Sequence, residues 1–167
     1  KLDPRTGKVV IYRLDGKDGK AVGAHSVIAA ADGAMWLATE GEFTRFDPKT
    51  ETFHRFPKPD SVPQRPGGIV AIDNKGNVWG ASASGVIKMD PETGKYTFHQ
   101  AVTAATAYGI TVDKEDNVWF AQIIADKIGV VEASGRVSEV VLPPAAGNLA
   151  NDRDRELMST LWVGPNR

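Results

Sequence analysis

The chain has 167 residues, a formal net charge of −1 and no cysteine. This length is enough for one domain of ordinary size. The basic residues are scattered, which excludes the positive stripe of a nucleic-acid-binding surface, and no apolar run reaches the roughly 18 residues of a membrane-spanning helix. The absence of cysteine excludes disulfide bonds, thiolate metal sites and cysteine nucleophiles, and it leaves the compartment open.

In chain order, the first segment, residues 1–14, combines an Asp-Pro turn with an alternating run, a pattern that indicates the end of a repeat. Three complete repeats follow, over residues 24–57, 67–100 and 108–143. Each contains a short apolar run, a turn rich in Asp, Gly or Asn, a run centred on Trp, a second apolar run, a further turn and an alternating run. Residues 145–167 indicate a loop and the start of a further repeat.

The repeats have a period of about 42 residues, and tryptophans mark it at Trp36, Trp79, Trp119 and Trp162, at intervals of 43, 40 and 43 residues. Four short strands within a repeat of about 40–45 residues are typical of the blade of a β-propeller. No stretch of the repeats has sustained helical periodicity. The fold class that we predict is therefore all-β, with four-stranded antiparallel propeller blades.

The alternation of apolar and polar residues, bounded by turn formers, gives expected bounds for every strand. The predicted strands are 26–30, 34–38, 43–47, 52–56, 68–72, 77–81, 85–89, 95–99, 109–112, 117–121, 127–131 and 136–142.

The partial repeats at the two ends of the chain bear on the size of the ring. An open wedge of blades leaves unpaired sheet edges, so we expect these repeats to be part of a ring of about six to eight blades. The rest of the propeller, or another chain, would then cover the open edges. The alternative is a four-bladed ring, in which residues 1–14 supply the outer strand of a last blade around Trp162.

The third repeat is similar to the blades of the virginiamycin B lyase (streptogramin lyase) family of seven-bladed propellers. The matching motifs are Tyr108-Gly-Ile, Asn117-Val-Trp-Phe-Ala-Gln122, Asp126-Lys-Ile-Gly129 and Gly135-Arg-Val-Ser-Glu139. The first two repeats match more loosely, and the resemblance covers residues 1 to about 144. Gluconolactonase-like and NHL-type propellers share much of the same blade pattern.

This resemblance implies an activity and a compartment. In the family, a His from a first strand and a Glu from a second strand gather near the ring axis with Mg²⁺ and open the ester of a cyclic depsipeptide by elimination. A neutral imidazole can accept the proton beside a carbonyl, and Mg²⁺ polarises that carbonyl. A periplasmic or secreted location is implied by the family alone.

In this sequence the family's His position is held by His25, eleven residues before Trp36, and the matching positions hold Gly67 and Tyr108. First strands are innermost in a propeller, so equivalent positions on them converge. We therefore predict that His25, Gly67 and Tyr108 line one ligand-binding channel. His25 is the candidate catalytic base or metal ligand, and the alternative is that it is only a polar residue of the channel wall.

The family's Glu position, three residues after each Trp, holds Thr39, Ser82 and Gln122 in the three repeats. Glu40 misses this position by one residue and would reach the same face only through a bulge at Ala38. The metal ligands therefore stay unknown, and no cofactor is evident unless Mg²⁺ serves the lyase reaction.

Other conspicuous residues have simpler interpretations. His54 and His99 fall on fourth strands and are expected at the solvated rim, and Asp113–Asn117 lacks the spacing of a calcium loop and is expected to be a hairpin tip. The tryptophans are expected to pack between blades, with a stacking surface for a sugar or aromatic ligand as the alternative.

Two functions remain open on the sequence. One is a scaffold that binds a small molecule or a protein at the propeller axis. The other is a metal-dependent carbon–oxygen lyase of the virginiamycin B lyase type, with most catalytic residues outside this segment. The two differ in whether carboxylates reach His25.

Overall fold

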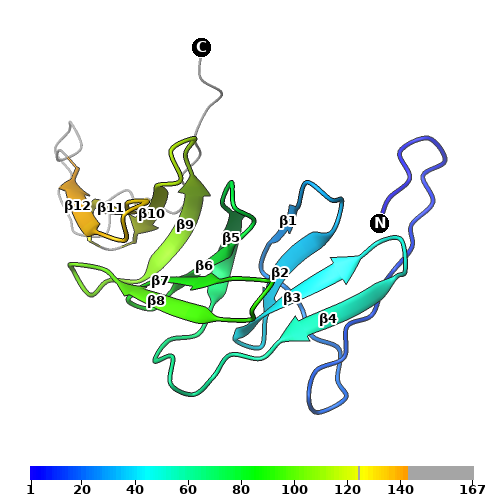
Figure 1. Cartoon of the computed structure of the whole chain (residues 1–167). Helices are drawn as coiled ribbons and strands as arrows, with labels where there is room; N and C mark the ends of the chain where they lie inside the picture. Colours follow the sequence, from blue (N-terminus) through cyan, green and yellow to red (C-terminus); the bar gives the residue numbers. More distant parts are fainter. Residues whose placement is uncertain (124, 143–167) are drawn as a thin grey trace, which may run out of the picture.

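The computed structural model describes residues 1–123 and 125–142. These residues form three four-stranded antiparallel sheets and contain no helix. In each sheet the strands pair in chain order, so every sheet is a simple meander. The three sheets lie side by side in chain order across the molecule (Figure 1).

The predicted strands are all present, and their ends differ from the predicted bounds by no more than two residues. The first sheet contains β1 (Val27–Ala29), β2 (Met35–Thr39), β3 (Glu42–Asp47) and β4 (Thr52–Phe56). The second contains β5 (Gly67–Ile72), β6 (Val78–Ser82), β7 (Gly85–Met89) and β8 (Tyr96–Gln100). The third contains β9 (Ala107–Val112), β10 (Val118–Gln122), β11 (Lys127–Val131) and β12 (Val137–Val141).

A carboxylate organises the loop between the first two strands of the second and third sheets. Asp73 accepts hydrogen bonds from the backbone N–H of Asn77, at 2.8 Å, and from the indole N–H of Trp79, at 2.9 Å. Asp113 accepts the equivalent bonds in the third sheet. The acidic loop that starts at Asp113 is thus a hairpin tip, as predicted, and its carboxylate is occupied by its own loop.

Two apolar clusters join the sheets. The first lies between the first and second sheets and includes Trp36, Phe43 and Met89. The second lies between the second and third sheets and includes Trp79 and Phe120. Burial of apolar side chains between neighbouring sheets is what holds successive blades of a propeller together.

The tryptophans occupy equivalent places, but they are not equally buried. Trp36 and Trp79 are 4 % and 5 % exposed, whereas Trp119 is only half-buried. Each pairs with the middle of a third strand, opposite Arg45, Lys88 and Val130. Trp119 differs because it lies on the face of the third sheet that no other described sheet covers. The packing role predicted for Trp36 and Trp79 is confirmed.

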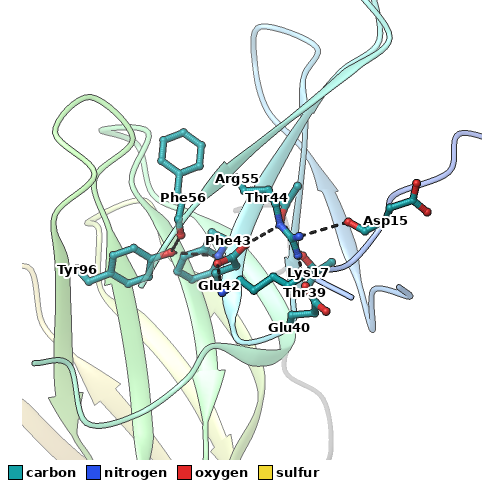
Figure 2. Close-up of polar contacts among 10 residues, drawn as sticks. All are labelled: Asp15, Lys17, Thr39, Glu40, Glu42, Phe43, Thr44, Arg55, Phe56 and Tyr96. Atoms are coloured by element: carbon teal, nitrogen blue, oxygen red, sulfur yellow. Dashed lines mark hydrogen bonds and ion pairs between the residues drawn. The ribbon is translucent and has the colours of Figure 1, made fainter. Parts of the chain in front are cut away.

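One buried tyrosine connects two sheets through hydrogen bonds. The hydroxyl of Tyr96 donates to the carbonyl of Phe56, at 2.5 Å, and accepts from the backbone N–H of Phe43, at 3.1 Å (Figure 2). Burial raises the pKa of Tyr96 to about 12, against the opposing effect of the bond from Phe43. Its hydroxyl therefore stays protonated and can donate.

The two rim histidines differ from each other. His54 is exposed, as expected. His99 is half-buried against Trp79, with ring centroids 5.2 Å apart, and burial together with Lys88 lowers its pKa. The expectation of a fully solvated side chain was wrong for His99, because the indole of Trp79 lies beneath it.

Residues 1–14, expected as the end of a blade, carry a single bridge between Leu2 and Val9 and no strand. The ring of Tyr12 packs against that of Phe46, with centroids 4.7 Å apart, so the segment contacts the first sheet. Its assignment to a blade stays a prediction, as do the predicted bounds of the repeats. The loop and further blade expected at 145–167 lie outside the described residues.

The three sheets are propeller blades in their strand number, antiparallel order and packing. Across the described residues, no helix has the length and apolar character needed to cross a membrane.

Candidate functional site

The first strands of the second and third sheets are irregular at the end where the site lies. Gly67 pairs with Ala81 and Val70 pairs with Gly80. The two residues between them in β5, Gly68 and Ile69, therefore have no partner in β6. A smaller irregularity interrupts the pairing of β9 with β10. Bulges of this kind turn side chains out of the regular alternation and are frequent beside functional sites.

These irregular strand ends surround a pocket of about 300 Å³. Its lining comes from the segments that precede or begin first strands and from the ends of second strands. The lining residues are His25, Arg65, Gly67, Gly68, Ala81, Ser82, Ala83, Thr106, Ala107 and Tyr108. The structure thus brings together all three residues predicted to share a channel. Their part in binding a ligand stays a prediction.

His25 and Tyr108 form the polar contact of this pocket. His25 Nε2 is hydrogen-bonded to the hydroxyl of Tyr108, and the two rings meet edge to face with centroids 5.2 Å apart. His25 lies two residues before β1 and Tyr108 lies on β9, so the contact joins the first and third repeats. Gly67 and Gly68 line the same pocket, and a β-carbon at Gly68 would lie 3.8 Å from the ring of Tyr108.

Ser26 fixes the position of His25. Its hydroxyl donates to the carbonyl of Gly68, at 3.1 Å, and accepts from the backbone N–H of Val70, at 3.0 Å. The segment before β1 is thereby tied to both ends of the β5 irregularity. Gly68 has a φ of 64°, a conformation that suits glycine. A serine adjoining the histidine was the only sequence signal for this tie, and our sequence analysis missed it.

The residues at the family's Glu position do not form a common carboxylate site. Ser82 lines the pocket and donates to the carbonyl of Gly85, at 2.8 Å. Thr39 is hydrogen-bonded to Thr44 within the first sheet. Gln122 is fully buried and donates to Glu139 and to the carbonyl of Thr103.

Glu40 is not recovered by a bulge. The pairing of β2 with β3 is regular through Ala38 and Thr39, and Glu40 forms the turn together with Gly41, with φ values of 48° and 78°. Its carboxylate is paired with Arg55 (Figure 2). Glu40 is not among the residues that line the pocket. Glu40, which misses the family's Glu position by one residue in the sequence, therefore lies away from the pocket in the structure.

Glu40 belongs to an ionic cluster at one end of the first sheet, shown in Figure 2. Glu42, with only 3 % of its side chain exposed, lies 2.6 Å from Arg55 Nε and 3.6 Å from Lys17 Nζ. Arg55 also pairs with Glu40 and donates to the carbonyl of Asp15. Two carboxylates thus face two cations, and the cluster is neutral.

A second ionic cluster lies in the third sheet. Glu139 accepts from Lys127 Nζ at 3.0 Å, from Gln122 at 3.0 Å, and from the backbone and hydroxyl of Thr103. Burial alone would raise the pKa of Glu139, but these hydrogen bonds outweigh it and lower the pKa to about 2. Glu139 is therefore a structural anion, fully ionised at neutral pH.

The pocket does not fit Mg²⁺ within the part of the chain that the structure describes. Its lining offers an imidazole and three hydroxyls but no carboxylate, and Mg²⁺ prefers hard oxygen ligands that include carboxylates. No group of three or more His, Asp or Glu side chains suited to a metal ion occurs among the described residues. The lining also contains Arg65, whose positive charge opposes the binding of a cation.

Arg65 was missed by the sequence analysis. It lies outside the repeating strands, just before Pro66 and Gly67, so no periodic pattern singles it out. Thr106 was missed for the same reason, since it precedes β9 by one residue.

Comparison with solved structures supports the β-propeller fold. Virginiamycin B lyase from Staphylococcus aureus matches with a TM-score of 0.69 and 20 % identity, over 86 % of this chain and 48 % of that one. A streptogramin B lyase matches with a TM-score of 0.65 and 23 % identity, over 79 % and 44 %. A candidate gluconolactonase matches with a TM-score of 0.62 and 18 % identity, over 90 % and 55 %.

The chain therefore spans about half the length of the lyases that it matches. The resemblance seen in the third repeat is confirmed at the level of the fold, which is all that such identities establish. No family model matches the sequence, and no curated protein matches it either.

Proposed function

We propose that this part of the chain is a propeller scaffold that binds a small molecule in the pocket at the ends of the first strands. The observation that carries the proposal is convergence: His25, Gly67 and Tyr108, from three successive blades, line one cavity. Ligand sites are typically concave, with an apolar lining and a few directed polar groups. Here glycines and alanines provide the apolar lining. The polar groups come from His25, Ser82, Thr106 and Tyr108.

The scale of the cavity favours a small molecule over a protein as the axial partner. A volume of about 300 Å³ is at the lower end of the range for ligand pockets. A protein partner would need a much larger contact surface, on the order of 800 Å² per side. The uncovered face of the third sheet, on which Trp119 lies, is where we expect the rest of the propeller or another chain to pack.

The test is a pair of matched substitutions examined by amide chemical shifts in NMR spectra. A panel of small ring compounds added to the protein should shift the amides of His25, Gly67 and Tyr108. Ala83→Trp, which fills the pocket from its lining, should abolish these shifts. Ala104→Trp, at an exposed position outside the lining, should leave them intact. Shifts confined to His54 and His99 would place binding at the rim and contradict the proposal.

A second candidate function is a carbon–oxygen lyase that linearises a cyclic depsipeptide. It is favoured by one observation, that His25 lies in the pocket of a fold shared with virginiamycin B lyase. His25 would be the base that removes the proton beside the carbonyl. The pocket lining has no carboxylate among the described residues, so Mg²⁺ and its ligands would have to come from outside them.

The lyase proposal is tested by turnover of virginiamycin B in the full ring. His25→Ala should abolish ring opening, while Tyr108→Phe, which removes the hydroxyl but keeps the ring, should reduce it less. Unchanged turnover in the His25 variant would leave this segment as scaffold only. The binding experiment above remains informative in either case, because it does not depend on turnover.

A further inference from the structure

We propose that the ligand of this pocket carries an anionic group, such as a carboxylate or phosphate, and that Arg65 recognises it. The inference rests on the proposed ligand-binding function and adds the chemical class of the ligand. It starts from the charges around the pocket. Arg65 is the one lining residue with a permanent charge, and no carboxylate lines the pocket within the described residues.

Arg65 contacts Gly41, and the two carboxylates that flank Gly41 in the sequence already have partners. Arg65 lies over Gly41, where a β-carbon would come within 2.8 Å of its Cδ. The residues on either side, Glu40 and Glu42, pair with Arg55, and Glu42 also approaches Lys17 (Figure 2). Because the two carboxylates and two cations balance, this cluster leaves the charge of Arg65 uncompensated.

Arg65 itself forms no ion pair with any of the described carboxylates. Its aliphatic stem is nevertheless held in place, because it packs on the bare backbone of Gly41, whose φ is 78°. Arg65 is an exposed residue, and a guanidinium without an ion-pair partner presents several N–H donors in one plane, a geometry that matches carboxylate and phosphate oxygens.

The remaining lining suits the other end of such a ligand. Gly68, Ala81 and Ala107 contribute apolar surface against which a flat ring could pack, and His25 and Tyr108 contribute polar groups. A small aromatic or cyclic acid would therefore combine burial of its ring with an ion pair at Arg65.

Benzoate and its neutral isostere benzamide are the probes that isolate the charge. We expect benzoate to shift the amides of Gly67 and Tyr108 with a dissociation constant in roughly the millimolar range, and benzamide to bind about tenfold more weakly. Arg65→Gln should bring the two probes to equal affinity. The matched control Arg5→Gln, at an exposed arginine outside the pocket lining, should preserve the difference.

Inorganic phosphate separates the two kinds of anion. Phosphate competition with benzoate would support an anion site that also accepts phosphate-bearing ligands. The absence of competition would overturn the phosphate part of the proposal and restrict the site to carboxylates. Equal affinity for benzoate and benzamide in the unmodified protein would overturn the anion proposal while leaving the pocket a binding site. If no probe shifts the pocket amides, the anion proposal fails, and the ring-compound panel then decides the proposed function separately.

Discussion

Complementary residue sizes across paired strands determine how the centre of each sheet packs. In the third sheet Phe120 lies opposite Gly129, whereas in the second sheet Gly80 lies opposite Ile87. The large and the small residue have exchanged strands, and the pair remains complementary. Close packing of this kind leaves little room for an added atom.

Gly129→Ala is expected to destabilise the protein. A β-carbon at Gly129 would lie 2.1 Å from the ring of Phe120, which is fully buried and cannot retreat. Overpacking of a core costs about 1–3 kcal/mol, and urea denaturation would measure it. Gly23→Ala, where a β-carbon would meet nothing within 4 Å, is the control and should be nearly neutral. Adding Phe120→Leu to the Gly129 variant should recover part of the loss, and a fully stable Gly129→Ala protein would contradict this account.

Glu139 is expected to make the stability fall in acid. Its folded-state pKa of about 2 lies below the ordinary value of 4.5, so its stabilisation is complete above about pH 4.5 and disappears as the pH falls through 2. The difference corresponds to roughly 3 kcal/mol. Unfolding free energies measured by urea between about pH 5 and 2 should therefore fall more steeply for the parent protein than for Glu139→Gln.

Glu132→Gln is the control for this acid dependence. Glu132 also has a lowered pKa, caused chiefly by its hydrogen bond from Arg136, but it is paired at the surface, where solvent screening makes such bonds weak. Its substitution should leave the slope almost unchanged. Parallel pH profiles of the parent and Glu139→Gln proteins would show that the buried cluster does not depend on this charge.

At the scale of single elements, the loop that begins with Asp73 holds one sheet to the next through its tryptophan. Asp73→Ala would remove the acceptor of Asn77 and of the Trp79 indole, both of them buried. We expect a loss of about 2–4 kcal/mol, because buried donors left without a partner are costly. Asp60→Ala, at an exposed position, is the control for loss of a carboxylate. Thermal or urea denaturation would compare them, and equal effects would argue against the loop network.

The strands could be predicted from the sequence because alternation, turn residues and the recurring Trp all give the same register. The pocket was predictable only in part. His25, Gly67 and Tyr108 follow from repeat alignment, since equivalent positions on inner strands converge. Arg65 and Ser26 do not, because their roles depend on how a non-repeating segment crosses Gly41 and how a bulge turns the start of β5. Neither feature leaves a periodic trace in the sequence.

On the scale of the whole molecule, packing between sheets should determine how much each tryptophan contributes to stability. Trp79→Ala should cost about 3–5 kcal/mol, as is usual for large core residues, because its side chain is enclosed between the second and third sheets. Trp119→Ala should cost less, since the half-buried Trp119 faces no described sheet. Urea denaturation of the two variants compares them, and a larger loss for Trp119 would mean that its face is covered.

The two ionic clusters also distinguish the repeats from one another. Glu42 and Arg55 in the first sheet occupy the same strand positions as Lys127 and Glu139 in the third, with the signs reversed, and the second sheet has Gly85 and Phe98 there. Tandem repeats of similar sequence are prone to exchange strands while they fold. A fourth strand paired with the wrong third strand would place Glu139 beside Glu42, or Arg55 beside Lys127. Such like-charge contacts penalise these mispaired forms, so the reversed signs disfavour exchange of fourth strands between the first and third sheets.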